Sequence, residues 1–265
     1  MAKSLVAAYG PWALVTGATR GIGAEFARQL AEQGFNIVLL ATNDRLLRKR
    51  ADELELAYGI RTRTIRLDLA REDIIKAMLP ATEDLDIGLL INNAGMSTVG
   101  PFVAQTPDYL VRQLHVNARA GLILAHHFGI KMALRQRGGI IFVSSGSAQH
   151  GTPYSANYAG TKAYDLILAE SLWYELKPYG VDVLGFMCGA TNTDGWDENE
   201  PKPDPMVPVG EVGPAVAKAL RSLGHGPSVA NGTLNRLGYK VMGMVSRARA
   251  VKILGSSMDK MFGPF

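Results

Sequence analysis

Short apolar segments alternate with helical patterns along most of this 265-residue chain. Five of them are nearly continuous in apolar residues, at 12–16, 36–41, 86–91, 140–144 and 181–187, whereas the sixth, at 61–67, alternates with polar residues. Continuous apolar strands are typical of a parallel sheet that helices cover on both faces. Since crossovers between parallel strands are right-handed, we predict an α/β fold. It is a Rossmann-type doubly wound parallel sheet in a single domain, with its ligands at the carboxyl ends of the strands.

Helical patterns fill the gaps between these strands. They predict helices over residues 21–34, 44–58, 71–79, 107–136 and 155–177, the second of them capped by Asp44. Residues 194–214 are rich in proline and acid, so a regular strand is not expected there. A surface loop is one interpretation, but long loops in compact domains are often functional, which favours a substrate lid.

The distribution of charge separates the end of the chain from the rest. The net charge is +4, but residues 233–265 hold six of the 28 basic residues and one of the 24 acidic residues. We therefore treat 1–232 as the catalytic domain and 233–265 as a basic, amphipathic C-terminal extension. Residues 1–232 are close to neutral, so any affinity of this domain for phosphate must come from a local site and not from its net charge.

Several classes of protein are not expected from the composition. The single cysteine, Cys188, allows no intramolecular disulfide and favours a reducing, cytoplasmic location. No apolar run reaches the roughly 18 residues of a membrane span, and the N-terminus lacks the apolar region of a secretory signal. His126 and His127 are adjacent and point in different directions on a helix, so no metal site is predicted.

A glycine cluster, TGATRGIG at 16–23, lies between the first strand and the first helix. Such a turn brings backbone N–H groups and a helix N-terminus together, which suits a pyrophosphate. A glycine cluster alone often marks only a turn, but its position between strand and helix favours a dinucleotide site. The residues assigned to the cofactor here are Gly17, Thr19, Arg20, Gly21, Ile22 and Gly23.

The end of the second strand indicates which dinucleotide is preferred. An acid there would accept hydrogen bonds from the adenosine ribose and repel a 2′-phosphate. The chain has Thr42 and Asn43 instead, with no acid before Asp44, while Arg20 and Arg45 could neutralise a phosphate. This favours NADP(H). NAD(H) stays open, because threonine is a weaker phosphate ligand than arginine and Asp44 could turn toward the ribose.

Tyr158 and Lys162 lie four residues apart on a predicted helix and therefore share a face. A free tyrosine, with a pKa near 10, is a poor base, but a neighbouring ammonium and a cationic nicotinamide favour the phenolate and lower that pKa. Such a tyrosine can give a proton to a carbonyl oxygen or take one from an alcohol. Ser145, at the end of the fifth strand, can hydrogen-bond the same oxygen. Alone, the Tyr–Lys spacing would indicate only a surface pair.

Together these residues resemble the short-chain dehydrogenase/reductase family, nearly over the whole chain up to about residue 193. The loop at 16–23 is similar to the family's cofactor loop, NNAG at 92–95 to its asparagine turn, and the step of thirteen residues from Ser145 to Tyr158 to its catalytic spacing. The resemblance implies a catalytic tetrad of Asn117, Ser145, Tyr158 and Lys162. In that tetrad Asn117 supports a water relay to Lys162, and Lys162 also holds the nicotinamide ribose.

The resemblance also implies cofactor contacts outside the glycine loop. Asp68, after the third strand, is similar to an acid that contacts adenine. The family's Pro-Gly after the sixth strand is replaced here by Cys188 and Gly189, and we expect the lone cysteine to be packed and not to act as a nucleophile. The additional cofactor residues are Asp68, Leu69, Asn93, Ala94, Gly95, Gly189, Thr191 and Thr193, together with Tyr158 and Lys162.

The C-terminus departs from the commoner family ending. It lacks the glycine-rich closing strand of bacterial β-ketoacyl reductases, and GPSVANGTLNRLG leads into the basic extension instead. With YGPWALVTGATRGIG and WYELKPYGVDV, this ending more loosely resembles very-long-chain 3-ketoacyl and 17β-hydroxysteroid reductases. That resemblance implies a lipophilic substrate. We assign the substrate end to Met96, Ser147, His150, Tyr154 and Trp196.

The extension carries apolar residues at helical spacing, namely Leu237, Val241, Met244, Val245 and Ala248. A closing helix packed on the domain is the favoured interpretation, and a helix on an anionic membrane surface is the alternative. One aromatic residue beside the charges and no motif argue against nucleic acid as a partner. The resemblance implies a homodimer or homotetramer, paired through the helices at 107–136 and 155–177.

The sequence therefore predicts an NADP(H)-dependent oxidoreductase. It would transfer a hydride between the nicotinamide and a carbonyl or secondary alcohol of a lipophilic substrate, such as a ketone, a steroid or a ketoacyl compound. One alternative is an NAD-dependent alcohol dehydrogenase of the same fold. Another is a non-catalytic dinucleotide-binding regulatory protein, against which the complete tetrad argues.

Overall fold

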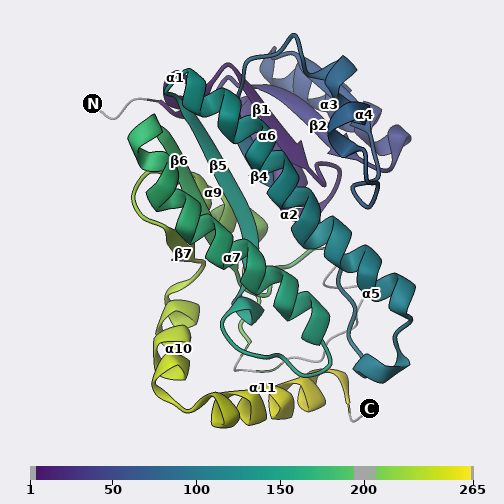
Figure 1. Cartoon of the computed structure of the whole chain (residues 1–265), viewed down its shortest axis with the longest axis vertical. Helices are drawn as coiled ribbons and strands as arrows, with labels where there is room; N and C mark the ends of the chain where they lie inside the picture. The colour runs from purple at the N-terminus through teal and green to yellow at the C-terminus, as the bar shows by residue number, and fades with distance from the viewer. Residues whose placement is uncertain (1–3, 194–203, 205–206, 264–265) are drawn as a thin grey trace.

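The computed structural model describes residues 4–193, 204 and 207–263 and is built around a parallel sheet of seven strands (Figure 1). The strand order is β3-β2-β1-β4-β5-β6-β7, so the direction of winding reverses between β1 and β4. The predicted doubly wound sheet is confirmed. The strands are β1 (Trp12–Thr16), β2 (Asn36–Ala41), β3 (Thr62–Arg66), β4 (Ile87–Asn92), β5 (Gly138–Ser145), β6 (Val181–Cys188) and β7 (Ser228–Ala230).

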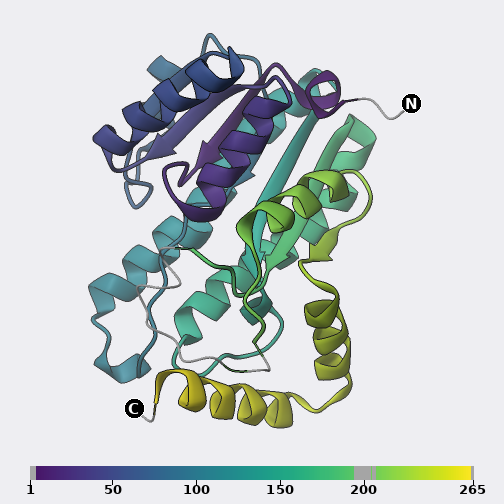
Figure 2. The ribbon, with the colours of Figure 1, turned by 180° about the vertical axis from the view of Figure 1, so that it is seen from behind.

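Helices cover both faces of the sheet, as the apolar strands require. One face packs against α1 (Leu5–Tyr9), α2 (Gly21–Glu32), α3 (Asp44–Tyr58) and α9 (Val212–Ser222). The opposite face packs against α4 (Ile74–Met78), α6 (Ala120–Leu134) and α7 (Ala156–Leu176). Figure 2 shows α2 and α9 in front of the sheet, whereas α6 and α7 are in front in Figure 1. Short 3₁₀ turns occur at Leu79–Ala81, Phe102–Ala104, Gly146–Ala148 and Lys177–Tyr179.

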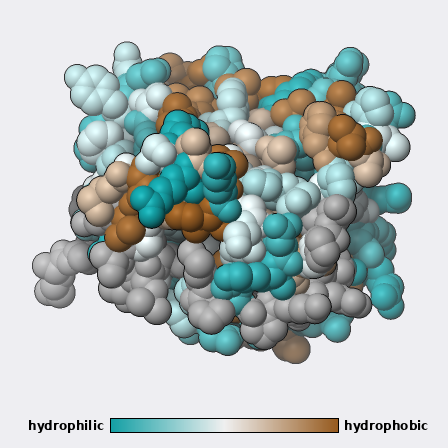
Figure 3. All heavy atoms as spheres, turned by 90° about the horizontal axis from the view of Figure 1, so that it is seen from below, coloured by the Kyte–Doolittle hydropathy of each residue, from teal (hydrophilic) through white to brown (hydrophobic). Residues whose placement is uncertain are grey.

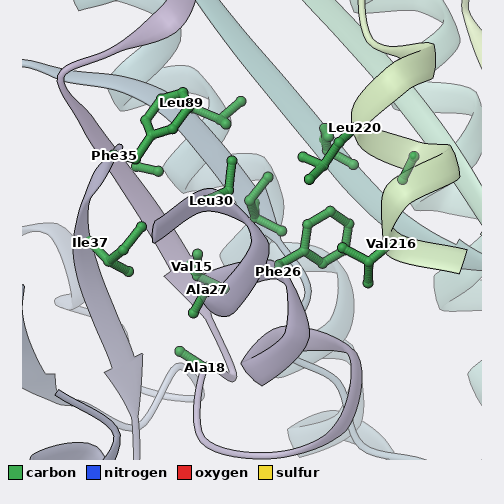
Figure 4. Packing of buried hydrophobic residues seen from close by; sticks show 14 of the residues in the cluster. Val15, Ala18, Phe26, Ala27, Leu30, Phe35, Ile37, Leu89, Val216 and Leu220 are labelled. Atoms are coloured by element: carbon green, nitrogen blue, oxygen red, sulfur yellow. The ribbon is translucent and has the colours of Figure 1, made fainter. Parts of the chain in front are cut away.

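The core on the α2 face forms because apolar side chains recur on one side of that helix. Phe26 and Leu30 of α2 are fully buried between the sheet and α9, where Phe26 lies beside Val216 (Figure 4). Burying a side chain of this size contributes about 1.5–3 kcal/mol. This packing fixes the start of α2, and with it the glycine loop, against the ends of the strands.

The helical pattern predicted at 107–136 is confirmed, because α5 (Pro107–Leu114) continues through a π-helical turn, His115–Arg119, into α6. One detail of the predicted helices is wrong. The cap of α3 is Asn43 and not Asp44, because the Asn43 side chain accepts a hydrogen bond from the Leu46 N–H at 3.1 Å. Asp44 instead is the first residue inside the helix, where its charge favours the helix N-terminus.

Two predictions about the C-terminal part are also wrong. A closing strand is present, because β7 pairs in parallel with β6, with Val229 opposite Phe186. It has three residues and follows α9, which the sequence pattern did not reveal. The apolar series at 237–248 does not form a single helix either, since α10 (Thr233–Met244) ends before Ser246, which caps α11 (Arg247–Phe262). Val241 and Met244 are exposed, whereas the buried side chains among those that the structure describes in the extension lie in α11.

None of the helices in the described part of the chain is long and apolar enough to cross a membrane. Among the same residues, no group of three or more His, Cys, Asp or Glu side chains could hold a metal ion.

Candidate active site

Thr16 joins the ends of β1 and β4, at the point where the winding of the sheet reverses. Its hydroxyl donates to the Ile91 carbonyl at 3.2 Å and accepts from the N–H groups of Asn93 and Ala94, both at 2.9 Å. The Asn93 side chain in turn donates to the Thr16 carbonyl at 2.9 Å. These bonds fix the predicted asparagine turn beside the glycine loop. In doubly wound sheets, ligands bind in the crevice at such a reversal.

The glycine loop requires glycine for two different reasons. Gly17 has a φ of +66°, which L side chains rarely adopt. A Cβ on Gly23 would lie 2.2 Å from the Gly17 carbonyl oxygen and 2.4 Å from Asn93 Nδ2, so no side chain fits. Beyond this tight turn α2 begins at Gly21, after Arg20, whose side chain forms no capping bond. The N-terminal amides of α2 therefore face outward from the loop, and this arrangement fits a pyrophosphate.

The two residues that directly follow β2 are not acidic. Thr42 and Asn43 are exposed there, and the Asn43 side chain is used as a helix cap. Asp44 forms an ion pair with Arg48 at 2.8 Å, which holds its carboxylate along α3. Arg45 is exposed and forms no ion pair with the part of the chain that the structure describes. This edge therefore offers positive charge and hydroxyl groups.

Asp68 lies after β3 and is held by two donors. Its carboxylate accepts from Arg112 at 2.8 Å and from the Ala70 N–H at 2.9 Å. Partial burial opposes ionisation, but these two donors outweigh it and keep the pKa of Asp68 below its ordinary value. Leu69, also predicted to contact the cofactor, is buried in the core.

Lys162 is buried at the centre of the predicted tetrad, with 4% of its surface exposed. Its ammonium donates to the Val143 carbonyl at 2.8 Å and to Asp165 Oδ2 at 3.0 Å. Burial alone would lower the pKa of Lys162, but the charges of Asp165 and Tyr158 more than offset it and raise that pKa. The pair Tyr158–Lys162 is thus electrostatically coupled, as the spacing of four residues predicts.

Asn117 occupies the π-helical turn between α5 and α6. Its side-chain oxygen accepts from the Met96 N–H at 2.7 Å, and its amide donates to the Met96 carbonyl at 2.9 Å and to Thr161 Oγ1 at 3.1 Å. A wide helical turn is frequent at functional sites, because it presents a residue that a regular helix would turn away. Asn117 therefore connects the segment after β4 to the helix that carries Lys162.

Ser145 ends β5 and keeps a hydroxyl proton to donate. Its Oγ accepts from the Ser147 N–H at 3.2 Å, so the oxygen serves as an acceptor within the loop. The neighbouring Ser144 hydroxyl donates to the Lys162 carbonyl at 2.7 Å, which ties the end of β5 to α7 at the catalytic turn. Ser147 Oγ is buried and has no hydrogen-bond partner in the described residues.

The segment after β6 returns to the glycine loop. Thr191 is buried and donates to the Gly189 carbonyl at 2.8 Å, while Thr193 Cγ2 would lie 3.2 Å from a Cβ on Gly21. Cys188 is packed, as predicted, and burial raises the pKa of its thiol to about 11. A thiol with such a pKa is a poor nucleophile near neutrality.

The residues assigned to the substrate are not all brought together. Met96 is held by Asn117, whereas Tyr154 has a φ of +61° and interacts with Asp259 of α11, whose charge raises the pKa of its phenol. His150 lines an apolar cavity of about 430 Å³ together with Val251 of α11. Trp196 and most of the predicted lid at 194–214 lie outside the described residues.

Three residues of the site were missed by sequence reasoning. Thr16 precedes the glycine loop, and only the neighbouring strand reveals its hydrogen bonds. Asp165 lies three residues after Lys162, a spacing that places both on one helix face, but the sequence does not show that this face is buried. Tyr239 of α10 is also near the site, since a Cβ on Gly146 would lie 2.0 Å from its hydroxyl.

Comparison with known proteins adds to this geometry. The sequence profile of the short chain dehydrogenase family matches residues 11–204. A 7β-hydroxysteroid dehydrogenase of Clostridium sardiniense is 30% identical over 255 residues, 96% of this chain and 97% of that protein. A solved structure of a 7β-hydroxysteroid dehydrogenase superposes with a TM-score of 0.89 at 27% identity, covering 95% of this chain and 99% of that one. A short-chain dehydrogenase of Sphingobium yanoikuyae, solved with NADPH, has a TM-score of 0.77 at 30% identity, covering 90% and 98%.

Proposed function

The chain belongs to the short chain dehydrogenase family and is a dehydrogenase or reductase of CH–OH and keto groups. From that premise we propose that it uses NADP(H) to interconvert a lipophilic ketone and the corresponding secondary alcohol. The observation that carries this proposal is the buried Lys162 ammonium, electrostatically coupled to Tyr158 and tied to the strand that ends at Ser145.

The dinucleotide supplies or accepts the hydride when it is bound. Tyr158 donates the proton to the carbonyl oxygen during reduction and removes it from the alcohol during oxidation. The Lys162 ammonium stabilises the phenolate that Tyr158 becomes when it has given up its proton. Ser145 uses its hydroxyl proton to hold the substrate oxygen in place, while its Oγ accepts from the Ser147 N–H.

The preference for NADP(H) is supported by the end of β2. No acid points to the place of the adenosine ribose, because Asp44 is paired with Arg48 at 2.8 Å. Arg20 and Arg45 are exposed beside it and supply positive charge for a 2′-phosphate. The relative from Sphingobium yanoikuyae was solved with NADPH, which agrees with this assignment.

A lipophilic substrate is supported by the relatives and by the apolar surfaces near the site. The 7β-hydroxysteroid dehydrogenase of Clostridium sardiniense matches nearly the whole chain. The cavity beside His150 is lined mostly by apolar or small residues of the loop after β5 and of α7, together with Arg247 and Val251 of α11. A steroid or another bulky secondary alcohol therefore heads the series of substrates to test.

A homo-oligomer is supported by apolar residues on the outer sides of α5, α6 and α7. Ile167 and Tyr174 of α7 are 61% and 77% exposed, and Leu134 of α6 is 82% exposed. Exposed apolar side chains that gather on neighbouring helices mark interaction surfaces. Analytical ultracentrifugation tests this: the wild type should sediment as a dimer or larger, and Ile167→Glu should shift it toward the monomer.

The decisive experiment for the function is a cofactor-coupled screen of ketones, aldehydes, steroids and β-ketoacyl thioesters with NADPH and NADH. We expect turnover with NADPH and a loss of about a thousandfold or more in kcat for Tyr158→Phe, which keeps the fold. Absence of turnover across the panel would favour a regulatory dinucleotide-binding protein. Equal or better turnover with NADH would reject the cofactor preference.

The cofactor preference has a matched test at the end of β2. Thr42→Asp introduces the acid that the strand lacks, which should bind the ribose hydroxyls and repel a 2′-phosphate. We expect the ratio of kcat/KM for NADPH to that for NADH to fall by about tenfold or more, an order that one charge at close range supports. Thr42→Asn, of nearly the same size, should leave the ratio close to the wild-type value.

A further inference from the structure

Asp165 is a buried acid beside the catalytic lysine. Its carboxylate lies 3.0 Å from Lys162 Nζ, and the side chains of Asp165 and Lys162 are 4% and 5% exposed. Both residues lie on α7, one helical turn apart, on the face that packs against β5 and β6. Screening by water is therefore small. Burial raises the pKa of Asp165 above its ordinary value, and the Lys162 ammonium opposes that rise, so the two side chains determine each other's charge.

The second oxygen of Asp165 has a different environment. Asp165 Oδ1 and Asn92 Oδ1 are both buried and have no hydrogen-bond partner among the described residues. Both side chains lie near Gly121, because a Cβ there would be 3.8 Å from Asp165 Oδ1 and 3.8 Å from Asn92 Cγ. Buried acceptors that have no donor are costly, so a donor near these two oxygens would stabilise the site.

A small cavity borders these two oxygens. It measures about 10 Å³ and is lined by Asn92 and Asp165 together with Thr16, Asn117 and Gly121. This volume suits a single water molecule, and a water donates two hydrogen bonds, one for each oxygen. Gly121 borders this space without a side chain, and a Cβ there would lie 3.8 Å from Asp165 Oδ1.

We propose that Asp165 is the positioning residue of the catalytic lysine. Its Oδ2 keeps Lys162 in the ammonium form and fixes Nζ near Gly95, while its Oδ1 shares one internal water with Asn92. With Val143 and Asp165 accepting two of its three protons, Lys162 has one N–H left for the cofactor and tyrosine side. This inference rests on the proposed function only where it concerns the rate of reduction.

Removing the negative charge of Asp165 should shift the titration of Lys162 in one direction. Apart from Asp165, the titratable groups that face Lys162 are Tyr158 on the same helix and Cys188 on β6, whose thiol is neutral near neutrality. Neutralising Asp165 removes a negative charge from this buried group, which lowers the proton affinity of its neighbours. Lys162 then loses its proton at a lower pH, because burial is no longer offset.

The kinetic test is the pH profile of kcat/KM for ketone reduction in Asp165→Asn. We expect the alkaline limb to move to lower pH by about one unit, a loss of roughly tenfold on the alkaline side. Glu175→Gln makes the same chemical change on an exposed part of α7 and should leave the profile unchanged. Superimposable profiles for wild type and Asp165→Asn would overturn the proposal, even if the variant is less stable.

A second measurement does not depend on catalysis or on a substrate. The ¹³Cε signal of Lys162, assigned by its loss in Lys162→Arg, reports the protonation of this lysine directly. We expect the wild-type signal to remain that of an ammonium to a higher pH than the signals of exposed lysines in the same spectrum, and to titrate earlier in Asp165→Asn. If that variant does not fold, a wild-type Lys162 signal that titrates at or below the pH of the exposed lysines by itself overturns the proposal.

Discussion

The carboxyl edge of β1, β4 and β5 and the C-terminal extension, residues 233–265, meet the same substrate region but are built differently. At the sheet edge, hydroxyl and amide groups fix the turns after β1 and β4, as Thr16 and Asn93 show. The extension places α11 against the loop after β5 but leaves Val241 and Met244 of α10 exposed. Figure 3 shows the end of the molecule at which α11 lies in Figure 1. Hydrophobic residues lie among hydrophilic ones on that end.

Because of this difference, we assign the reaction to the sheet edge and the choice of substrate to the extension. The sheet edge holds the groups that move the hydride and the proton, and their geometry tolerates little change. The extension reaches the substrate side through α11, where Ser257 donates to Asp204 at 2.5 Å and Asp259 interacts with Tyr154. We therefore expect substitutions at the sheet edge to affect stability and cofactor affinity, and those in α11 to affect the substrate.

The largest contrast comes from placing one methyl group in each region. Gly23→Ala puts a Cβ 2.2 Å from the Gly17 carbonyl, so the loop must shift at a cost of about 3 kcal/mol. Gly238→Ala in α10 meets nothing within 4 Å, and alanine should stabilise that helix by about 0.5–1 kcal/mol. Chemical denaturation and dinucleotide titration measure both. Similar effects at the two positions would contradict the comparison.

A smaller effect is expected where hydrogen bonds are lost without added volume. Thr16→Val removes the acceptor of the Asn93 and Ala94 N–H groups, which should cost about 2–3 kcal/mol and weaken dinucleotide binding. Thr16→Ser keeps the hydroxyl and should recover most of this loss. Equal unfolding free energies for the two variants would show that these bonds do not hold the turn.

The extension is tested by Ser257→Ala in α11. Ser257 and Asp204 are 4% and 8% exposed, so removing the hydroxyl takes a donor from a buried carboxylate and should cost about 1–2 kcal/mol. We expect the substrate KM to rise severalfold while the dinucleotide Kd stays constant. An unchanged substrate KM together with weaker dinucleotide binding would contradict the comparison, because the extension would then serve the cofactor and not the substrate.

The sequence predicted the sheet edge better than the extension, for physical reasons. The strands up to β6, apart from β3, consist mostly of apolar residues, and Tyr158 and Lys162 follow from a spacing within one helix, so local pattern suffices. β7 consists only of Ser228, Val229 and Ala230, which are too few residues to show a strand pattern in the sequence. It forms because it pairs with β6.

Capping and burial set a second limit on what the sequence reveals. Asn43 and Asp44 are both good caps, so only the backbone shows which one accepts from Leu46. For Asp165, the sequence gives the spacing from Lys162 but not the burial, and burial decides whether an ion pair matters.

The smallest effect is expected on the outer side of α10. Val241 and Met244 are 47% and 78% exposed, so the double variant Val241→Ser, Met244→Ser should change the unfolding free energy by no more than about 0.5 kcal/mol. Met258→Ser in α11, where the side chain is 7% exposed, is the matched control and should cost about 2 kcal/mol or more. A loss above about 1 kcal/mol in the double variant would mean that α10 is covered in the assembled protein, because an exposed side chain has little burial to lose. The extension would then be buried like the sheet edge, and it would belong to a subunit interface.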